Sequence, residues 1–431
     1  MGLRIVSQSQ WQRVLRLGSE AGWVFAGQLL SLLGTLVGVR ILTEYLSPSA
    51  YGVLGLSLTI VALYTEVVIG GLIGAFTRFY SIAAKANDVN GYVRGVRTLL
   101  LLAAAIAVSL FLALTPLLLS GFEGLTLQMG LVVAVFAVLF GSNAALNAVL
   151  NGARRRSLVA FNSVVDAWLK IALAVLAIKL FGSSATSVLT AYAVSLSLVM
   201  LHQLYRVSQL REPGLVTAQQ KWSHEMFTFA WPASVWGIFT WAQLVADRWS
   251  LQTFYSTAEV GLYSVVLQLG YFPMSLLLGM LGTFLTPIFF NRTNDRLQHI
   301  DQSQDAIWLR IFWGGIGVSA LAALIAWGAK GLVFDLFTAE GFRAMSIYLP
   351  TMVLAGGLYG TASLLQVRLM AHMRMIPLAK IMITTALLGV GLTFSLASVW
   401  GIAGVVMAKF LFSLAYLAAL AYVTIFYSQR S

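Results

Sequence analysis

Seven charged residues lie inside long apolar stretches of the sequence, where charge is costly. They are the basic residues Arg40, Lys170, Arg248 and Lys409 and the acidic residues Glu66, Asp166 and Asp247. A charge at the centre of a membrane helix costs about 2.5–3.5 kcal/mol on insertion scales, so each needs a physical reason. Guanidinium and ammonium groups bind phosphate groups, and a buried carboxylate can couple to a proton or sodium ion. The four basic residues are therefore candidates for anion binding, and the three acids for ion coupling.

The composition excludes a soluble protein. Of 431 residues, 59% are hydrophobic and 10% are charged, whereas globular domains have about 25% charged residues. The formal net charge of +12 could suggest nucleic acid, but most basic residues stand in short clusters between apolar runs, as in the loops of membrane proteins. We therefore expect no nucleic-acid partner. The chain has no cysteine, which excludes disulfides and thiolate metal sites.

Apolar stretches long enough to cross a bilayer predict an all-α integral membrane protein with twelve transmembrane helices. Nothing at the amino terminus resembles a cleavable signal peptide. A turn at Gly401 and Gly404 is expected to divide the last apolar region into two spans. The predicted helices cover residues 20–43, 50–77, 98–120, 126–152, 157–180, 184–207, 227–251, 260–289, 307–334, 345–370, 376–399 and 401–427.

The loops between these helices predict the orientation in the membrane. One side collects 20 of the 27 Lys and Arg residues, and both termini lie on that side. The opposite side has five, and Lys170 and Lys409 lie within spans. Because Lys and Arg are concentrated in cytoplasmic loops, we expect both termini to be cytoplasmic.

A faint internal repeat divides the chain into halves, 1–215 and 216–431. Residues 45–52 align with residues 254–261 at an offset of 209, so that Gly52 matches Gly261. Residues 150–155 align with 369–374 at an offset of 219. Both matches fall at equivalent turns. They predict two six-helix bundles related by a pseudo-twofold axis along the membrane normal, with a central cavity between them.

Two turns resemble those of a known family. The Arg40-Ile-Leu…Leu46-Ser-Pro-Ser-Ala-Tyr-Gly52 stretch is similar to the R-x-L…P-x-x-Y-G turn of polysaccharide flippases, and Leu150-Asn-Gly-Ala-Arg-Arg-Arg156 is similar to a second turn of that family. The chain thus resembles Wzx-like flippases of the multidrug/oligosaccharidyl-lipid/polysaccharide superfamily. The corresponding second-half turn, 256–261, lacks the Pro and Tyr of the first.

The resemblance implies an alternating-access transporter in the bacterial inner membrane. Its substrate would be an undecaprenyl-pyrophosphate-linked oligosaccharide unit of O-antigen, capsule or exopolysaccharide, moved from the inner to the outer leaflet. We expect a proton or sodium ion to be coupled to this transport. The other expected partners are the membrane lipids around the chain and a polysaccharide polymerase. The alternative is a cation-coupled multidrug antiporter of the same superfamily. A channel is a weaker alternative, and an enzyme is not expected because no nucleophile-and-base arrangement is visible.

Each charged candidate also has a structural interpretation. Arg40 and Arg248 lie near span ends and could extend to headgroups or water. Asp166 and Lys170 are four residues apart, the spacing of an ion pair on one helix face.

Asp247 is adjacent to Arg248, so the two side chains project about 100° apart and at most one of them faces a cavity squarely. Lys409 and Glu66 have no partner on their own helices. Lys409 should face water or an acid on another helix, and Glu66 could instead pair with Lys170 or Lys409. We expect no cofactor. We also expect no metal site at the one local acid-and-His cluster, which comprises Asp295, His299, Asp301 and Asp305.

Overall fold

The computed structural model describes residues 8–121, 126–210, 221–281, 302–371 and 375–426, which form helices and no strand. Turns η1, η2 and η4 are π-helical and η3 is 3-10 helical. The elements are α1 (Gln8–Tyr45), α2 (Pro48–Tyr64), η1 (Thr65–Ile69), α3 (Gly70–Lys85), α4 (Val89–Gly121), α5 (Leu127–Gly152), α6 (Arg156–Phe181), α7 (Ala185–Ser208), α8 (Trp222–Phe254), α9 (Thr257–Val266), η2 (Leu267–Tyr271), α11 (Gln302–Phe337), η3 (Glu340–Tyr348), α12 (Leu349–Ala371), α13 (Met375–Ala421) and η4 (Tyr422–Phe426).

The helices confirm a multi-pass membrane protein. Nine segments within the described residues are long and apolar enough to cross a membrane. The count of twelve stays a prediction. Helices α6 and α8, of 26 and 33 residues, are not among the nine, and they carry four of the charged candidates. Segment Pro377–Thr424 is counted as one of the nine. Gly401 interrupts its helix with a φ of 56°, so the predicted turn is present.

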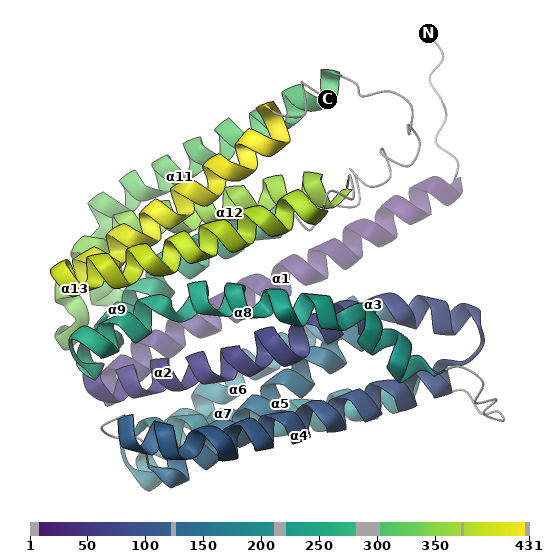
Figure 1. Ribbon diagram of the computed structural model, residues 1–431, viewed down its shortest axis with the longest axis horizontal. Helices are drawn as coiled ribbons and strands as arrows, with labels where there is room; N and C mark the ends of the chain where they lie inside the picture. Colours follow the sequence, from purple (N-terminus) through teal and green to yellow (C-terminus); the bar gives the residue numbers. More distant parts are fainter. Residues whose placement is uncertain (1–7, 122–125, 211–220, 282–301, 372–374, 427–431) are drawn as a thin grey trace.

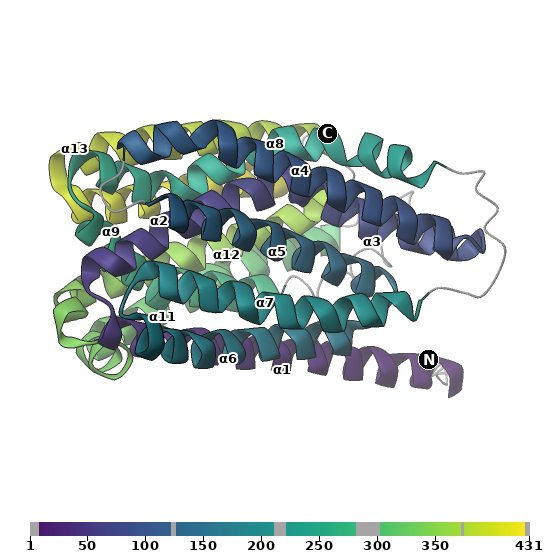
Figure 2. The same cartoon turned by 90° about the horizontal axis from the view of Figure 1, so that it is seen from below.

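The helices lie side by side along the long axis of the molecule (Figure 2). In Figure 1 they converge at one end, at the α1–α2 and α8–α9 turns, and diverge toward the other. Following the predicted orientation, we call these the outer end and the inner end. Serine starts the helices after both outer turns: Ser47 Oγ accepts from Ala50 N at 3.2 Å, and Ser256 Oγ accepts from Glu259 N at 3.3 Å. These caps satisfy amide groups at the helix starts.

Helices α2 and α9 cross at the two glycines that the repeat aligned. A Cβ on Gly52 would meet the Thr257 carbonyl oxygen, and a Cβ on Gly261 would meet the Pro48 carbonyl oxygen. The offset of 209 that relates Gly52 to Gly261 also relates Pro48 to Thr257. The contact between the two halves therefore pairs equivalent residues, and only glycine permits backbones this close.

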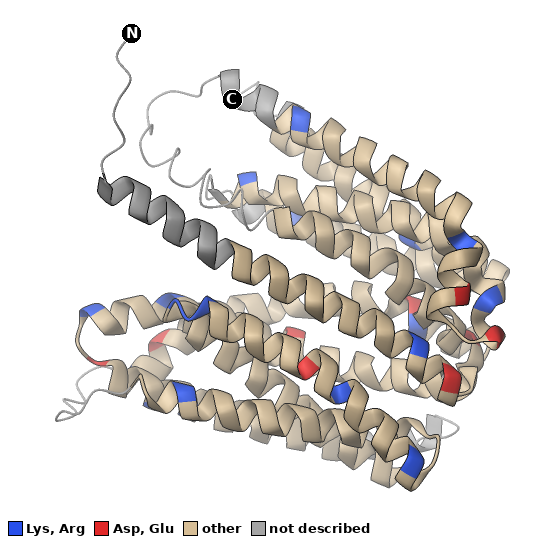
Figure 3. Ribbon diagram, turned by 180° about the vertical axis from the view of Figure 1, so that it is seen from behind, with Lys and Arg blue, Asp and Glu red and all other residues tan. Residues whose placement is uncertain are grey.

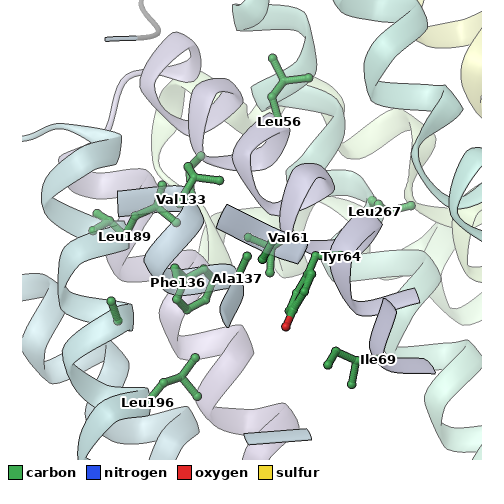
Figure 4. Close-up of a cluster of buried hydrophobic side chains, with 14 of the residues drawn as sticks. Leu56, Val61, Tyr64, Ile69, Val133, Phe136, Ala137, Leu189, Leu196 and Leu267 are labelled. Carbon is green, nitrogen blue, oxygen red and sulfur yellow. The ribbon is translucent and has the colours of Figure 1, made fainter. Parts of the chain in front are cut away.

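The first half has a hydrophobic core between α2, α5 and α7. Figure 4 shows Val61 and Tyr64 of α2 near Phe136 of α5, with Leu196 of α7 below them and η1's Ile69 on the far side of Tyr64. Helix α1 packs along α6, where Gly27 faces Ala160. This packing positions α1 and α6, which carry Arg40, Asp166 and Lys170.

Helix α8 contacts both halves of the chain. Near its start, Trp222 Nε1 donates to Asp88 Oδ2 at 2.8 Å in the α3–α4 turn. Farther along, Trp241 Nε1 donates to the Thr59 carbonyl of α2 at 2.9 Å. Its outer part packs against α13. The outer part of α8, which carries Asp247 and Arg248, is therefore held against α13.

Candidate functional site

Three helices bring a buried ion pair together near the outer end. Lys409 Nζ of α13 donates to Asp247 Oδ2 of α8 at 3.1 Å, and Tyr263 Oη of α9 donates to the same oxygen at 2.8 Å. The backbone N–H of Arg248 donates to Asp247 Oδ1 at 2.8 Å. Asp247 is 2% exposed and Lys409 is 4% exposed. Several hydrogen bonds thus offset the desolvation of the two charges.

The positions of Lys409 and Tyr263 follow from the turns that precede them. Lys409 lies eight residues beyond Gly401, about 12 Å along a helix, and Tyr263 lies seven residues beyond Ser256, about 10 Å. Both side chains therefore reach a similar depth below the outer end. The Lys409 ammonium also lies 5.2 Å from the ring centroid of Tyr271, within cation–π distance.

Arg248 adds a second cation that this ion pair does not neutralise. Because it follows Asp247 on the same helix, its side chain projects about 100° away. Its guanidinium is within electrostatic range of Tyr51 on α2, whose hydroxyl donates to Gln268 Oε1 at 3.2 Å. Arg248 is 9% exposed, and its Nε–H has no hydrogen-bond partner in the described part of the chain. The cluster therefore has one free donor and an excess positive charge.

A second charged pair stands on α6, as the spacing predicted. Lys170 Nζ lies 3.9 Å from Asp166 Oδ2, and Ser195 Oγ of α7 donates to Asp166 Oδ1 at 3.0 Å. The ammonium of Lys170 lies 5.7 Å from the ring centroid of Tyr192. Both charged side chains keep more than a fifth of their surface exposed. This pair is thus more accessible than the pair of Asp247 and Lys409.

Arg40 lies apart, at the outer end. Its guanidinium pairs with Glu44 Oε2 at 3.1 Å and donates to the Thr338 carbonyl oxygen at the end of α11. Nearby, the Ala339 N–H donates to Thr43 Oγ1 at 3.1 Å. Arg40 thus helps to join α1 to α11.

Glu66 stands in η1, midway between the two ends of its span. It is half-buried, and its side chain has no ion pair or hydrogen bond with any residue that the structure describes. The predicted alternative, pairing with Lys170 or Lys409, is wrong, because those lysines pair with Asp166 and Asp247. In Figure 3 most coloured charges gather toward the two ends of the helices, and few lie between them.

The sequence did not identify the uncharged members of the site. Tyr263, Tyr271, Tyr51 and Gln268 stand in apolar helices, where aromatic residues are mostly core. One signal was available: a tyrosine hydroxyl in an apolar span needs a partner. That signal indicates a polar neighbour without saying which.

No group of three or more His, Asp or Glu side chains that could hold a metal ion is present among the described residues. The cluster at Asp295, His299 and Asp301 lies outside them, as does the side chain of Asp305.

Comparison with family models identifies the family of the chain, and comparison with solved structures identifies its fold. The family model described as "Polysaccharide biosynthesis protein" matches residues 17–293. The structure of lipid II flippase MurJ in an inward closed conformation is similar, with a TM-score of 0.72 and 12% identity over 96% of this chain and 87% of that one. No curated protein sequence matches the chain.

Two solved states of a multidrug resistance MATE family transporter of the MOP superfamily are also similar. The inward-facing conformation has a TM-score of 0.72 and 14% identity, over 93% of this chain and 94% of that one. The outward-facing conformation has a TM-score of 0.64 and 14% identity, over 95% and 94%. At these identities the likeness establishes the fold.

Proposed function

The chain belongs to the polysaccharide biosynthesis protein family, and on that premise we propose that it flips undecaprenyl-pyrophosphate-linked oligosaccharides from the inner to the outer leaflet of the bacterial inner membrane. The single observation that supports this substrate class is the buried cluster of Asp247, Arg248 and Lys409, with its excess positive charge and free donor. A diphosphate is the complementary ligand, because one guanidinium group can donate two parallel hydrogen bonds to phosphate oxygens.

In this proposal Arg248 binds the diphosphate first, and the diphosphate then competes with Asp247 for Lys409. Arg248 has a free Nε–H, whereas Lys409 already has a counter-ion. The ion pair keeps the lysine from standing uncompensated in the empty transporter. Lys170 is assigned a further contact with the substrate, because its ion pair with Asp166 is long, at 3.9 Å, and partly exposed. Arg40 is left out of the substrate contacts because Glu44 and Thr338 occupy its guanidinium.

The transport mechanism proposed is alternating access between two six-helix halves, 1–215 and 216–431, with twelve spans and a central cavity. The reciprocal contact of Gly52 with Gly261 supports a pseudo-twofold axis through the α2–α9 crossing. The divergence of the helices toward the inner end (Figure 1), and the higher TM-score with the inward-facing transporter, support an inward-facing state with cytoplasmic termini.

The membrane potential would drive such export. Moving one negative charge outward from a negative interior is favourable by about 2.3 kcal/mol per 100 mV. Glu66 is proposed as the ion-coupling carboxylate because it is half-buried and forms no ion pair or hydrogen bond with the described residues. Asp166 and Asp247 are weaker candidates, since each already has a lysine partner.

A cation-coupled multidrug antiporter is the second candidate function, and the likeness to MATE transporters favours it. An organic cation would need an unpaired carboxylate, and Glu66 could supply one. The same substitution discriminates the two functions. Arg248→Gln should slow flipping of a diphosphate lipid, whereas it should leave cation export intact or increase it.

The test is a flipping assay in proteoliposomes with an undecaprenyl-diphosphate-linked oligosaccharide. We expect Arg248→Gln to slow flipping about 10- to 100-fold, the factor for one lost charged hydrogen bond. Lys409→Ala and Lys170→Ala should also slow it. Arg94→Gln, an exposed arginine of α4, is the matched control and should flip normally. Unchanged rates for Arg248→Gln and Lys409→Ala together would refute the cationic site.

A further inference from the structure

A small hollow at the inner end lies outside the site described above. It lies between the end of α5, the start of α6 and the end of α7, and its empty space, part of which is open to solvent, amounts to about 340 Å³. Five residues line it: Leu150, Arg155, Leu158, Arg206 and Gln209. All five belong to the first half, so the hollow does not depend on how the two halves meet.

The two arginines of the hollow have no acidic partner among the residues that the structure describes. Neither Arg155 nor Arg206 forms an ion pair or a side-chain hydrogen bond with any residue in the described ranges. The sequence contains no Asp or Glu between Glu123 and Asp166, nor between Asp166 and Glu212. Asp166 itself lies eleven residues beyond Arg155, about 16 Å along α6. No residue that the structure describes therefore supplies a counter-charge for the two arginines.

The backbone adds to the positive potential at the same place. Arg155 is the N-cap residue of α6, and no side chain caps the amide groups there. Its own N–H donates to the Leu150 carbonyl at 2.8 Å, which draws the end of α5 against the start of α6. An open helix start favours an anion, and the two guanidinium groups flank it.

The lining also has an apolar part. Leu150 is fully buried and Leu158 is half-buried, while Arg155 and Gln209 reach the surface. A ligand here would place an anionic group against the arginines and carbon atoms against the leucines. In the predicted orientation the hollow stands at the cytoplasmic headgroup level, where basic pockets between helices bind anionic lipid headgroups.

We propose that the hollow lined by Arg155 and Arg206 binds the headgroup phosphate of an anionic membrane phospholipid. The headgroup phosphate would accept hydrogen bonds from both arginines and join the ends of α5, α6 and α7. This site is separate from the transported substrate. It can be present whether or not the chain flips lipid-linked sugars.

Binding is tested on the purified full-length protein in detergent with phosphatidylglycerol as the probe, followed by native mass spectrometry. We expect Arg155→Gln or Arg206→Gln to weaken binding about fivefold, and the double variant about 25-fold. Arg94→Gln, which removes an exposed charge outside the hollow, should bind as the unmodified chain does. Equal phosphatidylglycerol affinity in the double variant and the unmodified chain would overturn the proposal.

Three further probes identify the source of the phosphate. Phosphatidylcholine, whose headgroup is neutral overall, should bind more weakly than phosphatidylglycerol and should not respond to the substitutions. If inorganic phosphate at millimolar concentration displaces phosphatidylglycerol, the hollow is instead a site for a free phosphate ion. If the double substitution weakens the binding of undecaprenyl diphosphate and of no other probe, the hollow is a docking site for the transported lipid. Either of these last two results would overturn the phospholipid assignment.

Discussion

At the scale of single residues, Asp247 and Lys409 each depend on the other. Lys409 is 4% exposed, so removing its counter-ion leaves a charge buried without compensation. We expect Asp247→Asn or Lys409→Ala to lower stability by about 3–5 kcal/mol, measured as an earlier thermal unfolding transition in detergent. The double variant Asp247→Leu/Lys409→Met should regain most of this stability, because apolar residues of similar volume replace the pair.

The same double variant separates structure from transport. If Lys409 binds the substrate diphosphate, the double variant stays stable but flips slowly in proteoliposomes. A double variant that regains both stability and normal flipping would mean that the pair has only a structural role.

Substitution of Glu66 should change the coupling of transport to an ion and leave the affinity for the lipid substrate unchanged. The Glu66 carboxylate is half-buried and forms no ion pair or hydrogen bond with the described residues, so it can take up a proton or a sodium ion. In Glu66→Gln we expect flipping to lose its dependence on pH or on sodium, measured by varying each across the vesicle membrane. Glu340→Gln, at an exposed outer position, is the control. Normal ion dependence in Glu66→Gln would exclude it from coupling.

The two charged pairs show what could be predicted from the sequence. Asp166 and Lys170 are four residues apart, so helix geometry alone predicted their contact. Asp247 and Lys409 are 162 residues apart, and only the packing of α8 against α13 brings them together. The sequence indicated that Lys409 needs water or an acid on another helix. It could not indicate which acid.

At the scale of elements, the α2–α9 crossing depends on Gly52 having no side chain. A Cβ there would meet the Thr257 backbone, which cannot move away as a flexible side chain could. We expect Gly52→Ala to lower stability by about 1–3 kcal/mol through overpacking, measured by thermal unfolding in detergent. Gly328→Ala on α11, where nothing lies within 4 Å of the added methyl, should leave stability unchanged or raise it.

The turns were easier to predict than the irregular helical segments. Gly401 was expected to separate two helices, and its φ of 56° is readily adopted by glycine. The π-helical turns η1 and η2 were not predicted, because no residue type marks an extra residue in a helical turn. Glu66 stands in one of these turns. The direction of its side chain therefore could not be obtained from a regular helical period.

At the scale of the whole molecule, alternating access requires the outer end to open during transport. Two seams close that end: the α2–α9 crossing, and the contact of Thr43 and Arg40 with the end of α11. The match over residues 17–293 places the chain in a family. The contacts across the two seams could not be predicted from the sequence, because each seam joins residues from different halves of the chain.

A cross-link across the second seam tests this motion. The chain has no cysteine, so a Thr43→Cys/Ala339→Cys variant carries a single thiol pair, at positions joined by a 3.1 Å hydrogen bond. We expect oxidation to stop flipping in proteoliposomes and a reducing agent to restore it, because the linked outer end cannot open. Each single-cysteine variant should flip equally well under both conditions. Full flipping by the oxidised, cross-linked double variant would show that the substrate leaves without separation of α1 from the end of α11, and the release path would then lie elsewhere in the molecule.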